Sequence, residues 1–381
     1  MVRTGIEREL ASGSLKGRRI GLVTNPSAVT GAGVPTWKAF LGAGYSVGAF
    51  FGPEHGFRGE AQDAVEVADG EFRGIPSYSL YGARLEPEPR MLDGLDLMVY
   101  DIQDVGCRYY TYLYTLAYVM KACEANSLPL AVLDRPDPLG GIEIEGPPIP
   151  DADASFVGGY RLPPRYGMTV GEFASYLKGE FFPKVKLEVL RLEGWKRGMY
   201  FDACGLPWVN PSPNIPSLQT AFVYPGTCLM EGTWLSEGRG TTRPFETFGA
   251  PYIDGVELQE YLARAGIPGA LFAPASFVPA FSKHANASCG GATLFVTDRE
   301  AFRPFAAGVT ILSSLKRLYP RDFAWRPTWE DEKRYFIDRL AGGAWLREGI
   351  DAGAGIRDLL ALAFAKTADF AELRRHYLLY A

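Results

Sequence analysis

Apolar and polar stretches alternate regularly over the first 141 residues. Four apolar runs have the length of buried strands, and each ends in polar residues, proline or glycine: 19–29, 45–56, 95–106 and 129–141. Between them, residues 34–44 and 110–126 carry the apolar content of helices, closed by glycine and by Asn126. Because strands alternating with helices form parallel sheets, this region predicts an α/β fold with helices on both faces of the sheet.

The rest of the chain has a mixed pattern. Residues 142–168 are rich in proline, glycine and aspartate and are the best candidate for a linker. An amphipathic helix at 169–182, capped by Thr169, and an alternating strand at 185–195 follow. Residues 208–254 have little periodicity, which is typical of functional loops. The remainder predicts further elements: a helix at 254–264, strands at 271–278 and 292–297, and helices at 304–318, 328–340 and 356–378.

The length of 381 residues supports two domains, because single cores tend to divide beyond about 250–300 residues. We therefore predict a Rossmann-like domain at 1–160 and a smaller α+β domain at 161–381, with an active-site cleft between them. The net charge of -5 argues against a nucleic-acid partner. No apolar run approaches the ~20 residues of a membrane span.

The N-terminal residues contain no apolar signal-peptide core. The five scattered cysteines form no CxxC motif, so they predict neither a zinc ribbon nor a disulfide framework. Free thiols fit a reducing compartment. We therefore expect a cytoplasmic protein, with export left open if a leader has been removed.

Polar residues cluster where the four predicted strands end: Asn25, Glu54–His55, Asp101–Gln103–Asp104 and Asp134–Arg135–Asp137. Open α/β sheets bind ligands outside the carboxyl ends of their strands, so these clusters predict one site. Neither GxGxxG after the first strand nor GxxxxGK[ST] is present, and we expect no nucleotide cofactor.

The segment FGPEHGFRGEAQDAVEV, residues 51–67, carries the strongest chemical signal. Glu54 stands in a turn braced by proline and glycine, where shielding would suit a general acid. It could equally accept backbone hydrogen bonds. His55 could orient Glu54, contact a ligand or be purely structural, and no second histidine lies at metal-ligand spacing. Asp101 and Asp104 are better suited to loop backbone and substrate hydroxyls than to a metal. We expect no metal site.

Several long segments together resemble one family: GLVTNPS, FGPEHGFRGEAQ, YDIQDVGCRYYTYLYTL, LDRPDPLGG, RYGMTVGE, PSPNIPSLQTAFVYPGTCLMEGT and SEGRGTTRPFETFGAP. They are similar to the exo-β-N-acetylmuramidases of glycoside hydrolase family 171, the NamZ type. The resemblance implies a Rossmann-like domain, a smaller second domain and an active site between them. It also implies release of terminal β-1,4-linked N-acetylmuramic acid from peptidoglycan fragments, with the catalytic glutamate at Glu54. Members of the family are often exported, which leaves the compartment open.

Glycoside hydrolysis usually needs a second group beside the acid. In the SEGRGTT segment we favour Glu237 as this second carboxylate, with Glu231 and Glu246 as competitors. The substrate's own 2-acetamido group could instead attack the anomeric carbon, and the sequence leaves this choice open.

Substrate contacts are expected from several motif residues. A guanidinium would bind the lactyl carboxylate of muramic acid in a bidentate manner, and Arg239 between two glycines is favoured over Arg58, Arg108 and Arg243. Tyr109 and Tyr110 could stack on the sugar. Sugar hydroxyls are assigned to Asn210, Ser212 and Asn214, although proline-rich turns use the same residues.

These assignments make a geometric prediction. The strand ends near residues 25, 54, 101 and 134 should open onto one cleft, with residues 210–214 and 231–246 as its other wall. Two rival functions remain: a glycosidase for another acidic amino sugar, and a non-catalytic binder of cell-wall sugar. A serine hydrolase is disfavoured because no GxSxG motif is present.

Overall fold

The structure, a computed structural model, describes residues 1–59, 68–328, 331–365 and 367–381. Part of the segment 51–67, namely residues 60–67, therefore lies outside the described residues, as do two positions of the helix expected at 328–340. Within the described residues no helix is long and apolar enough to cross a membrane.

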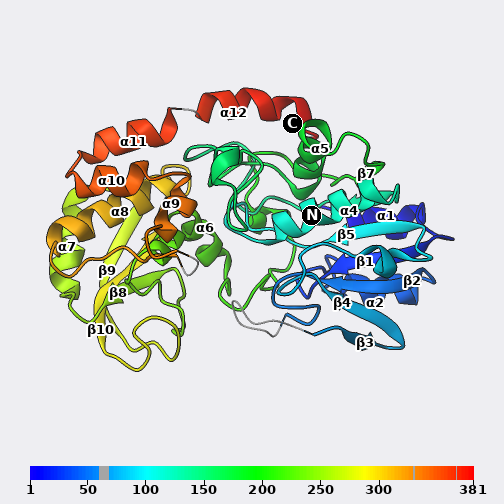
Figure 1. Cartoon of the computed structure of the whole chain (residues 1–381), viewed down its shortest axis with the longest axis horizontal. Helices are drawn as coiled ribbons and strands as arrows, with labels where there is room; N and C mark the ends of the chain where they lie inside the picture. The colour runs from blue at the N-terminus through cyan, green and yellow to red at the C-terminus, as the bar shows by residue number, and fades with distance from the viewer. Residues whose placement is uncertain (60–67, 329–330, 366) are drawn as a thin grey trace.

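A seven-stranded sheet in the order β3-β4-β2-β1-β5-β6-β7 forms the larger lobe, which we call the sheet lobe (Figure 1). Every neighbouring pair is parallel except the edge pair β3–β4, so the predicted Rossmann-like sheet is confirmed. Its strands are β1 (Arg19–Thr24), β2 (Ser46–Gly52), β3 (Gly70–Phe72), β4 (Ile75–Ser79), β5 (Leu97–Asp101), β6 (Leu130–Leu133) and β7 (Leu187–Leu190).

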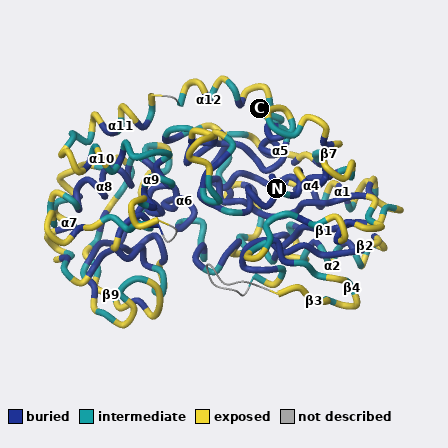
Figure 2. The backbone as a smooth tube through the Cα atoms, in the orientation of Figure 1, coloured by how far each residue is buried: buried dark blue, intermediate teal, exposed yellow. Residues whose placement is uncertain are grey.

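The central strands are apolar at successive positions because both faces of the sheet are covered. Leu22 of β1 belongs to one core cluster and Val23 to another, and β5 and β6 divide their residues in the same way. The helices of this lobe are α1 (Gly5–Ser12), α2 (Thr36–Gly42), α3 (Pro89–Leu92), α4 (Tyr112–Ala125) and α5 (Val170–Glu180). Figure 2 shows the central strands buried, whereas the edge strand β3 and the outer helix faces are exposed.

The N-terminal ends of α5 and α1 both carry capping residues. Thr169 caps α5, as expected, and its hydroxyl accepts a hydrogen bond from the Glu172 amide at 3.2 Å. Helix α1 was not predicted, although Thr4 and Glu7 form a capping box that marks its start.

The strand expected at 185–195 exists as β7, but it belongs to a different sheet from the one we predicted. We expected it in the second domain, but β7 pairs in parallel with β6 and completes the first sheet. A parallel partner needs a crossover, and α5 supplies it between β6 and β7. On this pairing we propose a domain boundary beyond Leu190 rather than at residue 160.

The second lobe contains an antiparallel three-stranded sheet in the order β8-β10-β9. Its elements are α6 (Leu218–Thr227), β8 (Thr247–Ala250), α7 (Gly255–Ala265), β9 (Ala270–Phe277), β10 (Cys289–Val296), α8 (Pro304–Leu318), α9 (Phe336–Ala341) and α10 (Trp345–Asp351). This is the smaller mixed unit that we expected. Helices α6 and α10 and strand β8 were missed, and α9 is shorter than the segment 328–340.

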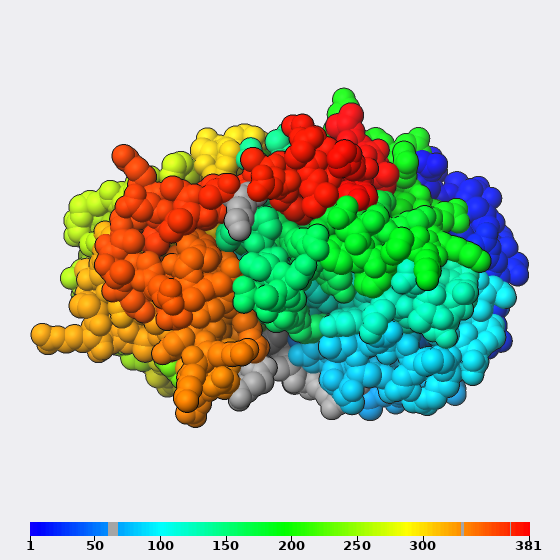
Figure 3. Space-filling model, turned by 45° about the horizontal axis from the view of Figure 1, so that its top comes forward, coloured from blue at the N-terminus to red at the C-terminus, as the bar shows by residue number. Residues whose placement is uncertain are grey.

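The C-terminal segment returns to the sheet lobe. The helix expected at 356–378 is two helices, α11 (Ile356–Phe364) and α12 (Thr367–Arg374), which run across the top of both lobes (Figures 1 and 3). Tyr380 then donates a hydrogen bond to Asp134 at the end of β6, and the Leu379 amide donates to Glu172 of α5 at 2.8 Å. The two chain ends therefore lie on the same lobe.

Candidate active site

A cavity of about 260 Å³ lies between the lobes. Its wall combines strand-end and helix-start residues of the sheet lobe with loop and helix residues of the second lobe. The lining residues are Glu54, His55, Tyr81, Tyr109, Tyr110, Thr111, Ser155, Phe156, Val157, Ser212, Asn214, Ile215, Tyr224, Cys228, Glu231, Arg239, Phe245, Phe336, Arg339 and Leu340. A volume of this size suits a single sugar ring rather than a drug-sized ligand.

Glu54 reaches the cavity because it stands in a tight turn directly after β2. The Gly56 amide donates to the Pro53 carbonyl at 2.9 Å, which closes the turn around Glu54 and His55. His55 has a φ of 69°, in the left-handed region that non-glycine residues rarely adopt. Such strain is concentrated at functional sites, so this backbone conformation supports a role for the turn.

The Glu54 carboxyl group is held from the neighbouring segment. Thr111, the residue before α4, donates its hydroxyl to Glu54 Oε2 at 2.6 Å. Glu54 is only 5% exposed, yet it lines the cavity. The carboxyl group is thus fixed in position with access to a bound molecule, as a general acid requires. Sequence reasoning missed Thr111.

His55 and Arg58 have different surroundings. His55 lines the cavity and also a neighbouring groove of about 200 Å³, in which Arg58 lies. The exposed Arg58 guanidinium sits 6.0 Å from the centre of the Phe72 ring. Arg58, which we expected at the substrate, therefore does not line the cavity.

Asp101 does not reach the cavity either, contrary to our expectation. Its carboxylate accepts two hydrogen bonds from Arg135, at 2.5 and 3.0 Å, and one from Thr36 at 2.5 Å. It is fully buried. Asp101 therefore joins the ends of β5 and β6 to the start of α2, which is a structural role.

Asp104 was also expected at the substrate and also lies away from the cavity. It accepts hydrogen bonds from the Gly106 amide at 2.7 Å and from the Tyr166 hydroxyl. Burial raises the pKa of Asp104 to about 6. The group supports the loop after β5 and does not line the cavity.

We expected the strand ends near residues 25, 54, 101 and 134 to open onto one cleft, but the end of β1 instead supports the cavity wall. Asn25 donates to the Pro211 carbonyl at 3.2 Å, and Tyr112 donates to the same carbonyl at 2.6 Å. This contact fixes the loop that carries Ser212 and Asn214, both of which line the cavity. Asn210 is exposed and lies outside it. Strand ends other than that of β2 thus position the wall instead of forming it.

Of the three second-lobe acids that we considered, Glu231 lines the cavity and Glu237 does not. Glu237 is 2% exposed and lies between Lys283 Nζ at 2.7 Å and Arg239 Nε at 3.3 Å. Burial opposes its ionisation, but these two cations outweigh burial and lower the pKa of Glu237. It is therefore an ionised partner in a buried ion-pair network. Glu246 accepts from Thr220 at 2.5 Å and steadies the start of α6.

Two arginines line the cavity, one expected and one missed. Arg239, as expected, lies on the wall, where it donates to Glu231 at 2.8 Å and packs over the Phe245 ring at 5.0 Å. Arg339 of α9 was not identified from sequence and also lines an adjoining groove of about 350 Å³.

The other two arginine candidates lie elsewhere. Arg108 is fully buried and donates to the carbonyls of Pro147, Leu162 and Leu340. Arg243 is exposed and lies beside Glu246.

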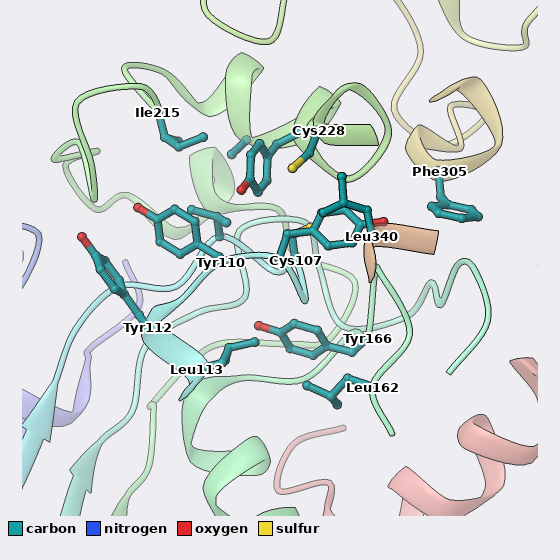
Figure 4. Close-up of a cluster of buried hydrophobic side chains, with 14 of the residues drawn as sticks. Cys107, Tyr110, Tyr112, Leu113, Leu162, Tyr166, Ile215, Cys228, Phe305 and Leu340 are labelled. Atoms are coloured by element: carbon teal, nitrogen blue, oxygen red, sulfur yellow. The ribbon is translucent and has the colours of Figure 1, made fainter. Parts of the chain in front are cut away.

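Aromatic rings form one part of the wall. Tyr224 packs edge-on against Tyr109, Tyr110 and Phe245, with ring centres 6.4, 6.1 and 4.7 Å away. Figure 4 shows Tyr110, Ile215, Cys228 and Leu340 gathered from separate segments into one cluster. Tyr109 and Tyr110 were expected near the sugar and do line the cavity, whereas Tyr224, Phe245 and Phe336 were missed.

The arrangement offers a buried carboxyl group, a histidine, guanidinium groups and aromatic rings around a space for one sugar. Among the described residues no group of three or more histidine, cysteine, aspartate or glutamate side chains could hold a metal ion. The side chains on the wall can transfer a proton and stabilise developing charge.

The chain is similar to known proteins over nearly all of its length. Residues 20–219 match the family model for the N-terminal part of exo-beta-N-acetylmuramidase NamZ, and residues 222–380 match that for its C-terminal part. The chain is 44% identical over 384 residues to the peptidoglycan beta-N-acetylmuramidase NamZ of Bacillus subtilis (strain 168), covering 100% of this chain and 91% of the relative.

Two crystal structures of DUF1343 family proteins from Bacteroides fragilis NCTC 9343 are also similar. They have TM-scores of 0.90 and 0.80 and sequence identities of 33% and 28%. In both comparisons the match covers 100% of this chain and 99% of the other. The likeness therefore extends over both lobes and the cavity between them.

Proposed function

The chain belongs to the exo-β-N-acetylmuramidase NamZ family, and from this premise we propose that it is a glycoside hydrolase acting on peptidoglycan fragments. It releases terminal β-1,4-linked N-acetylmuramic acid from their non-reducing ends. The observation that carries the proposal is the position of Glu54, fixed by Thr111 on the wall of a cavity of one-sugar size.

Glu54 acts as the general acid. It donates its proton to the glycosidic oxygen as the bond to the anomeric carbon breaks, so the leaving saccharide departs as a neutral alcohol. Thr111 donates a hydrogen bond to Oε2, which leaves Oε1 to carry the proton toward the substrate. His55, next in the same strained turn, contacts the substrate or orients Glu54.

The second catalytic group is either a carboxylate or the substrate's acetamido oxygen. Glu231 is the second-lobe acid on the cavity wall, so we transfer to it the role that the sequence favoured for Glu237. A direct glutamate nucleophile or a participating acetamido group gives retention at the anomeric carbon, whereas a glutamate base activating water gives inversion. Proton NMR of the first-formed anomer separates these routes.

The lactyl carboxylate binds to Arg339. Arg239 lies between Glu231 and Glu237, close to the second catalytic group. Arg339 lies where the cavity meets the adjoining groove, a position suited to a substituent at O3 that points away from the reacting carbon. A guanidinium there would favour a muramic acid over a glucosamine.

We propose the cytoplasm as the compartment, supported by five cysteines that are all free thiols. Separate assay of the cytoplasmic and extracellular fractions of the native host tests this point.

Glu54→Gln tests the function at its central residue. Glutamine keeps the shape and accepts the Thr111 hydrogen bond but has no transferable proton. We expect kcat on a disaccharide substrate to fall by roughly 10²–10⁴-fold, while substrate binding persists. An aryl glycoside with an acidic phenol needs less protonation, so its loss should be smaller.

Glu188→Gln, at an exposed glutamate of β7 in the same lobe, is the matched control and should keep full activity. A loss in Glu54→Gln of only a few-fold on the disaccharide would refute the assignment of the acid. Absence of any product from the wild-type protein would favour a sugar-binding protein that uses the same cavity.

A further inference from the structure

Tyr109 has a hydroxyl group that the structure leaves without a hydrogen-bond partner. The side chain is 2% exposed, and its oxygen contacts no donor or acceptor within the described residues. An unsatisfied buried hydroxyl is costly, and its persistence calls for an explanation. Because Tyr109 lines the cavity, a bound molecule can supply the missing acceptor.

The Tyr109 ring lies among aromatic side chains and a thiol, with the buried Arg108 guanidinium 5.4 Å from its centre. Tyr224 packs against its ring and against Phe245, and Cys228 is a close neighbour of both tyrosines. Burial raises the pKa of Tyr109 well above its usual value, so the hydroxyl stays protonated and donates. This part of the wall thus offers the unsatisfied Tyr109 hydroxyl beside aromatic rings, which complements a small group with one carbonyl oxygen and one methyl.

The position relative to Glu54 identifies which substituent this is. Tyr109 is two residues from Thr111, whose hydroxyl holds the Glu54 carboxyl group at 2.6 Å. The acid must reach the oxygen on C1 of the sugar. The substituent on C2, the adjacent carbon, therefore lies next to the acid, whereas the lactyl group on C3 lies one carbon farther away.

We propose that the pocket formed by Tyr109, Tyr224, Cys228 and Phe245 binds the 2-acetamido group of the substrate, with the Tyr109 hydroxyl donating to its carbonyl oxygen. This inference rests on the proposed function for the identity of the sugar. Tyr109 is a residue that determines specificity for N-acetylated sugars. It also holds the acetamido group in a fixed orientation beside the anomeric carbon.

Tyr109→Phe removes only the hydroxyl and tests the proposal. We expect kcat/KM on an aryl β-N-acetylmuramide to fall roughly tenfold to a hundredfold, as for a buried carbonyl that loses its donor. Tyr261→Phe, on α7 and outside the cavity, is the control and should retain wild-type activity.

A change in the substrate separates this role from a general loss of packing. Replacing the N-acetyl group by N-trifluoroacetyl weakens the carbonyl as an acceptor. If Tyr109 donates to that carbonyl, the replacement lowers kcat/KM more in the wild-type protein than in Tyr109→Phe. An equal effect of fluorination in both proteins overturns the proposal, even if Tyr109→Phe is less active overall.

A binding measurement keeps the test independent of turnover. Calorimetry compares free N-acetylmuramic acid with its N-trifluoroacetyl analogue on both proteins. The wild-type protein should prefer the N-acetyl form, and Tyr109→Phe should lose that preference. The same preference in both proteins, or no binding of either sugar to the wild-type protein, contradicts the inference. If the wild-type protein binds the sugars but hydrolyses no substrate, the proposed function is refuted, and the binding comparison still tests the role of Tyr109.

Discussion

Asp137, buried in the segment after β6, should make the protein less stable as pH rises. It is 2% exposed, its Oδ1 accepts from the Leu139 amide at 2.9 Å, and its Oδ2 has no partner within the described residues. Burial raises the pKa of Asp137 to about 8. In the unfolded chain an aspartate has a pKa of about 3.9, so between these values only the folded state holds the proton.

The sign and size follow from this difference in bound protons. Because the folded state binds one more proton than the unfolded state, the free energy of unfolding falls as pH rises through this window. One proton corresponds to about 1.4 kcal/mol per pH unit, or about 3 kcal/mol between pH 5 and pH 7. Burial also raises the pKa of Asp104 to about 6 and that of Asp134 to about 7, so the wild-type slope should be steeper still.

Asp137→Asn isolates this contribution because asparagine resembles the protonated acid and does not titrate. Urea unfolding followed by circular dichroism at pH 5, 6 and 7 gives the slope for each protein. The variant should lose about 1.4 kcal/mol per pH unit of the wild-type slope. Asp93→Asn, an exposed control, should leave it unchanged. Parallel curves for Asp137→Asn and the wild-type protein would refute the reasoning.

Two further predictions concern the second lobe. Lys283→Met removes a cation 2.7 Å from the buried Glu237, and we expect a loss of roughly 3–5 kcal/mol in stability, measured by urea unfolding. Adding Glu237→Met should recover part of it, and a single variant as stable as the wild-type protein would contradict the ion-pair role. Arg339→Met should lower the ratio of kcat/KM for a muramide over a glucosaminide by roughly 10–150-fold, the value of a hydrogen bond to a charged group. The exposed Arg357→Met, outside the cavity and the adjoining groove, is its control, and an unchanged ratio in Arg339→Met would assign the lactyl group to another residue.

Local patterns missed β3 and β4 at the exposed edge of the sheet, but they predicted β1, β2, β5 and β6 because these strands are short apolar runs followed by proline, glycine or polar residues. The turn that carries Glu54 is such a case, since its geometry depends on four consecutive residues. The membership of β7 in the first sheet was missed, because the pairing of Leu187–Leu190 with β6 is a contact between distant segments. The bounds of α9 were predicted poorly for the same reason, because the helix is stabilised by contacts with other segments.

The candidate site divides in the same way. Glu231 and Glu237 are each followed by glycine and look alike in the sequence, but Glu237 pairs with Lys283, which lies far along the chain. From sequence we predicted that Asp101 contacts the ligand. In the structure both of its oxygens accept hydrogen bonds from Arg135, which follows another strand. Acids at strand ends are thus recognisable from sequence, but their partners are set by the packing of the lobes.

The most direct test of the central claim is a comparison of two substrates on the wild-type protein. An aryl β-N-acetylmuramide and the matching β-N-acetylglucosaminide differ only in the lactyl group. We predict that the protein releases the chromogenic group from the muramide and cleaves the glucosaminide far more slowly, because the cavity guanidinium then lacks its carboxylate partner. Comparable rates on both sugars, or no release from the muramide, would contradict the account.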